Sequence, residues 1–397
     1  SGGRRLKRLD ENLVLQNIGY IDMYERKAIG HSFVNHKFGT MHTNRTGILF
    51  TKTFYDIDLR SSDQAGVPMA QYVKDNGQSD LWQAYTQSKF RITPALTANL
   101  GIHAQYFGIN SNYSIEPRAA VRWNFATGHA LSLGLGKHSQ LEDLKTYLAG
   151  KNGTKPNKNL DFSRAYHIVL GYDWSVNENI RLKVEPYFQY LSDIPVIQDS
   201  SYSRINFMQQ WFFNDKLVNE GTGQNLGVDI TIERYLHNGF YWLTTASVFD
   251  SKYTGGDGVQ RSSRFDRTYV ANLLFGKEFY FNRTSNKQTI LSLNGKLTFL
   301  GGERLHPVLE QESLSNEEIV FDHQNAFERS EDPTILSNLT ISYRINKTKH
   351  SSVWSLQVIN LFGAPSAHYD FYNFKKDKLD VFETRVTVPN LSYKIEF

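Results

Sequence analysis

Cysteine is absent from the 397 residues, and this absence excludes both a disulfide-bonded scaffold and a thiolate metal site. The sequence also lacks an apolar run of about 18 residues, the length that a membrane-spanning helix needs. An excess of one charge is missing too, because 44 Lys and Arg stand against 40 Asp and Glu, a net charge of +4. This balance excludes the strongly basic surface typical of a nucleic-acid-binding protein.

Aromatic residues, in contrast, are plentiful: 22 Tyr, 26 Phe and 6 Trp make up 14% of the chain. Disordered chains are poor in such residues, so the composition indicates a folded protein. A soluble chain of this length usually divides into two or three domains, and one large barrel is the alternative. The start, Ser1-Gly2-Gly3, is neither an initiator Met nor a signal peptide, so we expect further sequence upstream.

Apolar and polar side chains alternate along many segments. Alternation with a period of two predicts a strand with one apolar and one polar face. Many of the expected strands run about 10 to 17 residues, whereas strands of globular proteins run about 5 to 6 and membrane-spanning strands need about 9 to 11. Strand length therefore favours a membrane barrel. The clearest examples are 96–106, 180–190, 226–233, 291–299 and 391–397.

Short and long connections alternate between these strands. Outer-membrane barrels have tight periplasmic turns and extended extracellular loops, and the sequence fits that arrangement. It predicts an all-β fold, a large antiparallel transmembrane β-barrel of about 15 or 16 strands. Residues 32–397 are expected to form the barrel, and 1–31 an uncertain segment with one strand within 9–28. The expected long loops are 62–79, 139–159 (with a short helix over 141–148), 193–222, 254–264, 301–333 and 363–380.

Several short motifs resemble those of one family. Glu116-Pro117-Arg118 resembles the "EPR" strand of TonB-dependent outer-membrane receptors, in particular the large receptors of Bacteroidetes. His138-Ser139-Gln140 is similar to the "HSQ" segment that follows it there. The chain ends on Phe397, which resembles the aromatic last residue that barrel-assembly machinery reads. Two further segments fit the same family, 42–47 and 356–362.

The resemblance implies a function for a longer protein. Such receptors have barrels of about 22 strands with a plugged lumen. We find neither a plug domain nor a TonB-binding motif in these residues, so the resemblance covers the C-terminal part of a receptor. It implies the outer membrane and TonB-driven uptake of a large nutrient, an iron chelate or a glycan. The implied partners are outer-membrane lipid, the plug and TonB through the missing N-terminal part, and a surface lipoprotein; no nucleic acid and no cofactor is expected.

Charged residues on the polar strand faces are expected to line the lumen. In a receptor they would contact the plug, and in a porin they would set ion preference; simple solvation is the third reading. The candidates are Arg122, Arg181, Lys183, Glu185, Asp229 and Glu233.

Aromatic residues in two loops are the substrate-binding candidates. Exposed aromatic rings often mark binding surfaces, and beside Asn and Asp they suit sugars or aromatic chelates. Packing of loop on loop is the alternative. The candidates are Trp211, Phe212 and Phe213 in the loop 193–222, and His368, Tyr369, Phe371 and Tyr372 in the loop 363–380.

Two other functions compete with the receptor. One is a self-contained passive porin, from which an upstream plug sequence would distinguish a receptor. The other is an outer-membrane hydrolase, for which His103 and His167 lie on polar faces, without a partner Ser singled out. The G-x-S-x-G, H-E-x-x-H and P-loop motifs are missing from the sequence, so we expect no enzyme, no catalytic residue and no metal site. An acidic loop over 303–333 could offer Ca²⁺ its oxygen ligands, but EF-hand spacing is lacking.

Overall fold

A computed structural model describes most of the chain, and it consists almost entirely of strands. The described residues are 3–9, 14–62, 65–150, 153–207, 210–284 and 287–397, without the side chains of 282–284 and 366–368. Within these ranges no helix is both long and apolar enough to cross a membrane.

One antiparallel sheet of 17 strands dominates the molecule. Its strands are β1 (Arg4–Leu9), β2 (Leu15–Lys37), β3 (His42–Ser61), β4 (Ala70–Arg91), β5 (Leu96–Phe107), β6 (Asn112–Ala126), β7 (His129–Gln140), β8 (Ser163–Asn177), β9 (Ile180–Val196), β10 (Val218–His237), β11 (Phe240–Thr254), β12 (Gln260–Ser262), β13 (Tyr269–Thr284), β14 (Lys287–Leu300), β17 (Thr334–Lys347), β18 (Ser351–Ile359) and β21 (Val388–Glu396). Two separate two-stranded sheets pair β15 (Arg304–Leu305) with β16 (Arg329–Ser330), and β19 (Pro365–Asn373) with β20 (Lys378–Arg385). The helices are α1 (Leu144–Leu148), α2 (Glu310–Asn316) and the 3₁₀ turn η2 (Arg204–Asn206).

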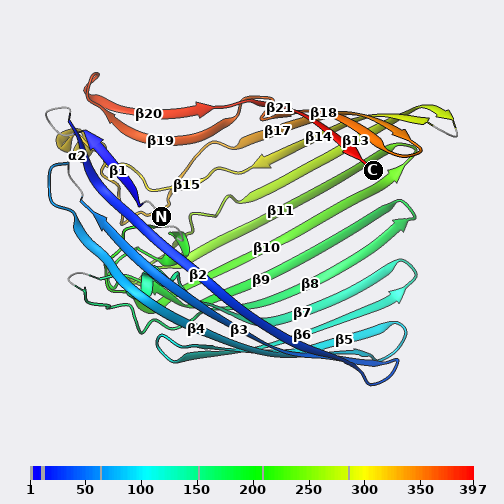
Figure 1. Cartoon of the computed structure of the whole chain (residues 1–397), viewed down its shortest axis with the longest axis horizontal. Coiled ribbons are helices and arrows are strands. Elements are labelled where there is room, and N and C mark those ends of the chain that lie inside the picture. The colour runs from blue at the N-terminus through cyan, green and yellow to red at the C-terminus, as the bar shows by residue number, and fades with distance from the viewer. Residues whose placement is uncertain (1–2, 10–13, 63–64, 151–152, 208–209, 285–286) are drawn as a thin grey trace.

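The sheet has two free edges. Each long strand pairs with the next long strand along the chain, from β2 and β3 to β18 and β21. Among the described residues, β21 bonds β18 alone, and β1 covers the edge of β2 only as far as Ile21. Figure 1 shows the result, a sheet curved into an incomplete barrel with β2 and β21 at its open side. The expected all-β barrel fold is confirmed, and the ladder does not close within the described part of the chain.

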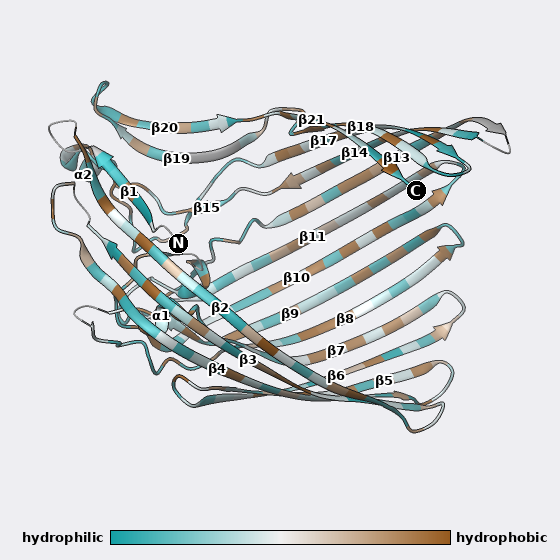
Figure 2. Ribbon diagram, viewed as in Figure 1, coloured by the Kyte–Doolittle hydropathy of each residue, from teal (hydrophilic) through white to brown (hydrophobic). Residues whose placement is uncertain are grey.

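The two faces of the sheet differ in polarity. Cross-strand pairing keeps polar residues together, as in His103 opposite Glu116, and apolar ones together, as in Leu100 opposite Ala119. Figure 2 shows this alternation along the strands. On the apolar face, Leu100 is 53% exposed and Ile168 49%. Apolar surface as extensive as this is unusual in a soluble monomer and suits contact with lipid.

Four details of the sequence prediction were wrong. Segment 62–79 is not a loop throughout, because β4 begins at Ala70 and its register with β3 runs to Ser61. Residues 70–79 carry polar side chains on both faces, so the alternation disappears although the backbone ladder continues. Segment 363–380 contains β19 and the start of β20, and the expected helix over 141–148 is shortened to α1. The strand β2 runs through residue 31, where we had placed a boundary.

The buried core lies at the loop end of the barrel, inside the curve of the sheet. Ile57, Leu59 and Val73, on the polar-facing side of β3 and β4, are at most 3% exposed because Leu148 and Ala149 pack on them. A second cluster comes from the strand ends and from the loops after β7 and β9: Phe107, Tyr147, Leu160, Phe162, Phe213 and Leu217. The loops therefore fold inward and bury their apolar side chains against the inner wall.

Candidate functional site

Two loops form an inner roof over the wall of β3 to β10. We call residues 141–162 and 197–217 the roof. Arg204, on η2 and 3% exposed, donates from Nε to Oε2 of Glu142 at 2.9 Å and from Nη1 to the carbonyl of Phe207 at 3.0 Å. A buried charge is costly unless it is paired and hydrogen-bonded, so this ion pair couples the two loops.

Further polar contacts fix the roof to itself and to β4. Asn157 is fully buried, and its Oδ1 accepts from the backbone N–H of Leu217 at 2.8 Å. The backbone N–H of Gly150 donates to the carbonyl of Tyr72 at 2.9 Å, and Lys155 Nζ lies 2.6 Å from Asp75 Oδ2. The loop after β7 thus reaches past β5 and β6, which are joined by a short turn, to bind β4.

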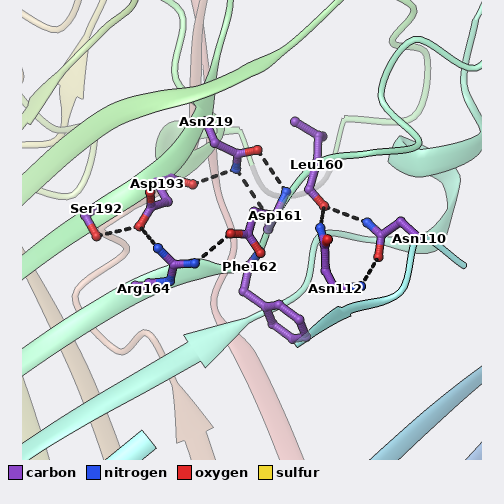
Figure 3. Close-up of polar contacts among 9 residues, drawn as sticks. All are labelled: Asn110, Asn112, Leu160, Asp161, Phe162, Arg164, Ser192, Asp193 and Asn219. Carbon is purple, nitrogen blue, oxygen red and sulfur yellow. Dashed lines mark hydrogen bonds and ion pairs between the residues drawn. The ribbon is translucent and has the colours of Figure 1, made fainter. Parts of the chain in front are cut away.

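The loop returns to the wall at the start of β8 through a set of polar contacts (Figure 3). The Asn110 side chain donates to the carbonyl of Leu160 at 2.8 Å. Arg164 donates to Asp161 at 2.6 Å and to Asp193 at 2.8 Å, which joins the loop to the end of β9. These contacts hold the Arg164 guanidinium between two carboxylates.

Glu116 is the centre of a polar network on the inner wall. It is 1% exposed and accepts hydrogen bonds from Arg118 Nη2 at 2.8 Å, Gln105 Nε2 at 2.5 Å and Ser114 Oγ at 3.1 Å. Nδ1 of His103 lies 3.0 Å from Oε2 of Glu116, the oxygen that also accepts from Arg118. The network gives the "EPR" motif a structural basis, since its carboxylate binds side chains of two strands.

Two histidines lie diagonally across β7 and β8. The rings of His138 and His167 are perpendicular, with centroids 4.9 Å apart. Nε2 of Gln189 lies 3.1 Å from Nε2 of His167, and Asn225 Nδ2 donates to Oε1 of Gln189 at 2.5 Å. Because Oε1 already accepts, Gln189 offers its amide N–H to His167, which places the ring proton of neutral His167 on Nδ1.

Several cavities follow the inner wall. One of about 630 Å³ runs along β4 to β8, and one of about 340 Å³ lies beneath the roof at β7 to β9. His138 and His167 line both. A third, of about 400 Å³, lies between the roof and β2 to β4. Among the described residues, no group of three or more His, Asp or Glu is placed to hold a metal ion.

The aromatic candidates of the roof differ in exposure. Trp211 is 46% exposed, lines the third cavity and lies under Lys145, whose Nζ is 4.6 Å from the ring. Phe212 packs on Tyr72 with ring centroids 5.6 Å apart, and Phe213 is buried in the core. Of these three residues, Trp211 is the most exposed, and its role in ligand binding stays a prediction.

The second aromatic group lies on the hairpin β19–β20. Tyr369 is exposed and stacks on Phe382, with ring centroids 4.8 Å apart. Phe371 is half-buried, and Tyr372 is buried with its hydroxyl bonded to Asp377. The side chain of His368 lies outside the described residues. These residues belong to a hairpin of their own, whereas Trp211 belongs to the roof.

All six charged lumen candidates lie on the polar face. Arg181 donates from Nε to Asp173 at 2.9 Å, Arg122 donates to the same carboxylate at 3.3 Å, and Lys183 lies 2.6 Å from Glu185. Sequence analysis missed Asp173, although its place on the polar face of β8 is a signal. The register sets Asp229 opposite Glu185 and Glu233 opposite Arg181. Phe397 follows β21 and is fully exposed, and its role in assembly stays a prediction.

The loop 301–333 packs beside the roof through aromatic contacts, because the ring centroid of Phe207 in the roof lies 6.0 Å from that of Phe327 and 6.3 Å from that of His306. The His306 ring lies 4.4 Å from that of Phe327 and 5.2 Å from that of His323. Burial lowers the pKa of His306, and the neighbouring His323 adds to this effect. Nδ1 of His306 is buried without a hydrogen-bond partner among the described residues.

Sequence comparison identifies the family. A family model described as "TonB dependent receptor-like, beta-barrel" matches residues 8–361. The chain belongs to this family. TonB-dependent receptors are outer-membrane transport proteins rather than enzymes, so this barrel lies in the bacterial outer membrane. No protein of curated function matches the sequence.

Solved TonB-dependent receptors share its fold. The ferric yersiniabactin uptake receptor FyuA from Yersinia pestis is 12% identical with a TM-score of 0.63, over 96% of this chain and 56% of that one. The ferric-catecholate import receptor Fiu from E. coli is 12% identical with a TM-score of 0.64, over 96% of this chain and 56% of that one. The FrpB iron transporter from Neisseria meningitidis is 10% identical with a TM-score of 0.61, over 98% of this chain and 58% of that one. The chain therefore spans a little over half the length of these structures.

Proposed function

We propose that the chain is the barrel part of a receptor that takes up a large nutrient, an iron chelate or a glycan, driven by TonB. The family match over residues 8–361 is the observation that carries this proposal. A plug domain and TonB are the proposed partners, and the plug would come from a part of the receptor outside these residues.

The two free edges of the sheet support a receptor over a self-contained porin. In the bilayer each backbone N–H and C=O needs a partner, and an open edge would leave a row of them in hydrocarbon. The free edge of β2 runs from residue 22 to 37 and that of β21 from 388 to 396. We propose that strands from outside the present residues pair with both edges.

The motifs around Glu116 and His138 support a receptor of the Bacteroidetes type. We propose that a surface lipoprotein contacts the extracellular loops of such a receptor. The exposed ring of Trp211 and the Tyr369–Phe382 pair are the proposed points of nutrient contact.

Nutrient-limited growth tests this function. The source bacterium is grown on a ferric chelate as its iron source, or on a glycan as its carbon source, after deletion of this receptor or of TonB. We expect both deletions to abolish growth on the same nutrient. Growth that needs the receptor and continues without TonB would instead indicate passive passage, as through a porin.

A further inference from the structure

We propose that a carboxylate-bearing segment of the plug domain docks on the inner wall of β2 to β5, where it pairs with Arg45 and Lys89. The inference deepens the proposed function and rests on it for the plug, and it adds the sign of the plug's charge at this place. We call this part of the inner wall the basic wall. It consists of six residues that line one cavity of about 370 Å³: Lys37, Thr43, Arg45, Gln87, Lys89 and Asn99.

Acidic residues are missing from the strands of the basic wall. The ranges 29–55 and 81–115 contain no Asp or Glu, whereas the chain as a whole has 40 of them against 44 Lys and Arg. Positive charge is therefore concentrated in this part of the barrel. The Lys and Arg residues of the two ranges are Lys37, Arg45, Lys52, Lys89 and Arg91.

Neighbouring strands of the barrel offer these cations no carboxylate. Lys89, on β4, lies opposite Thr43 and Asn99. Arg45, on β3, lies between two uncharged amide side chains, one on β2 and one on β4. The strands on both sides of each residue are present in the sheet, so a strand from outside these residues cannot lie beside them. A carboxylate partner for Arg45 or Lys89 therefore has to come from the lumen.

A plug in the lumen would take these charges out of water. Arg45 and Lys89 are exposed, and neither forms an ion pair with a described residue. The guanidinium carbon of Arg45 lies 4.2 Å from the centre of the Phe33 ring, a contact that positions the charge and does not neutralise it. Burying a charge is costly unless it is paired and hydrogen-bonded. The plug surface that covers the basic wall therefore has to bring carboxylates with it.

The wall of β8 and β9 differs, because it carries its own counter-charges. Nη2 of Arg181 lies 2.6 Å from Asp173 Oδ2, and Nζ of Lys183 lies 2.6 Å from Glu185 Oε2. A plug would meet pairs there that are already neutral. We therefore assign the carboxylates to the plug face over β3 and β4 rather than to the face over β8 and β9.

The wall next to the basic wall leaves room for another chain. Gly101, Ala120, Gly134 and Gly136 line the adjoining cavity of about 630 Å³, which has lining residues in common with the first. Apart from chain neighbours, the nearest atom to a Cβ added at Gly134 would be the carbonyl oxygen of Val169 at 4.0 Å, so packing within the barrel does not require glycine there. Glycine weakens the interior of a strand and often marks the close approach of another backbone. This hollow suits a plug segment that lies along the wall and reaches the two cations.

Zero-length crosslinking of the full-length receptor in detergent tests the contact. A water-soluble carbodiimide activates a carboxylate, a lysine amine in contact with it forms an amide, and mass spectrometry locates the joined residues. Lys89 is the reactive position of the wild type, and Arg45→Lys adds a second amine without changing the charge. Lys52 is the control, because it lies on the other face of β3 with Nζ 3.6 Å from Asp80 Oδ1 and should crosslink within the barrel.

We expect Lys89, and the amine introduced by Arg45→Lys, to crosslink to Asp or Glu of the plug. Crosslinks of Lys52 to Asp80 without any from Lys89 to the plug would overturn the proposal. Crosslinks of Lys89 to a carboxylate of the barrel or of a second receptor copy would do the same. The assay needs neither nutrient nor TonB, so a receptor that crosslinks as expected and supports growth without TonB would contradict the proposed function alone.

A second measurement compares charge variants of the full-length receptor in a planar bilayer. An unplugged barrel of this size leaves an aqueous channel, so the urea concentration at which conductance begins reports release of the plug. We expect this concentration to be about 1 M lower in Lys89→Glu and unchanged in Lys89→Arg, which keeps the charge. Lys378→Glu, the same substitution on β20, is the matched control and should behave like the wild type. Equal values for Lys89→Glu and the wild type would contradict the proposal.

Discussion

Oε2 of Glu142 accepts a hydrogen bond from Arg204 Nε at 2.9 Å, and this buried pair joins the loop that follows β7 to the loop that follows β9. The two residues are 62 positions apart in the chain. The roof over the inner wall depends on this contact because both partners are shielded from water: the side chains are 3% and 14% exposed.

Arg204→Ala should loosen the roof. Removing one partner of a buried ion pair leaves the other charge unpaired, at a cost of about 3–5 kcal/mol. Hydrogen–deuterium exchange of residues 197–217 should accelerate accordingly. Arg385→Ala is the matched control, since the Arg385 side chain is 61% exposed in its pair with Glu383 and such pairs contribute little. Equal exchange in the two variants would show that the pair does not hold the roof.

Substitution by arginine should have different effects at two neighbouring alanines of β6. Ala119 lies opposite Leu100 and Leu135 on the apolar face, and the next residue, Ala120, lies opposite Asn99 on the polar face. Ala119→Arg should disfavour folding in the membrane by about 2–4 kcal/mol, whereas Ala120→Arg should be tolerated. The readout is the folded fraction in the outer membrane by heat-modifiable gel mobility. Reversed or equal effects would contradict the assignment of the faces.

Acid should destabilise the packing of the loop 301–333. Burial and His323 lower the pKa of His306, Arg264 acts in the same direction, and Asp322 opposes them. His306 therefore takes up a proton at a higher pH in the released loop, near pH 6.5, than it does in the packed loop. Packing stability is fully present above about pH 6.5 and is lost as the pH falls toward the lowered pKa.

Limited proteolysis of this loop between pH 7.5 and 5.5 measures the effect. The wild type should be cut faster at the acid end, and His306→Gln should lose most of this dependence. His36→Gln, at the opposite end of the barrel, serves as the control and should behave like the wild type. A cleavage rate in the wild type that does not change with pH would refute the role given to His306.

Glu116→Ala should weaken the inner wall. The substitution leaves Arg118, His103 and Gln105 without their shared acceptor, at a cost of about 1–3 kcal/mol. Thermal unfolding of the full receptor should show a lower midpoint. Asp250→Ala removes an exposed partner of Lys252 and should leave the midpoint near that of the wild type. A midpoint unchanged by Glu116→Ala would mean that the network adds no stability.

The strands of the wall could be predicted from the sequence because their order is local. In 96–106 and 180–190 every second residue is apolar, and this period alone assigns the two faces. Beyond the membrane the rule fails, as at 70–79, because neither face of the strand needs to be apolar there. The alternation of short and long connections has a limit of the same kind. The short turn 108–111 joins β5 to β6 at the end of the barrel where other connections are long, because nothing in the local sequence requires a long loop there.

The roof could not be predicted, because its contacts join residues far apart in the chain. Trp211 and Phe213 are equivalent in local sequence, yet one is half exposed and the other 7% exposed. Their difference arises from what the fold places beside them, Lys145 for the first and the buried cluster with Phe107 for the second. Asp173 was missed for a related reason: its importance lies in two arginines on other strands.

Ion conductance of the 397-residue chain in a planar bilayer tests the central claim most directly, that this sheet is part of a larger receptor barrel. The edge of β2 from residue 22 to 37 and the outer edge of β21 have no partner among the described residues, so the chain alone should give no stable channel of uniform size. Large, long-lived openings of a single conductance would show that the chain closes by itself. That result would contradict the receptor account and identify a self-contained pore.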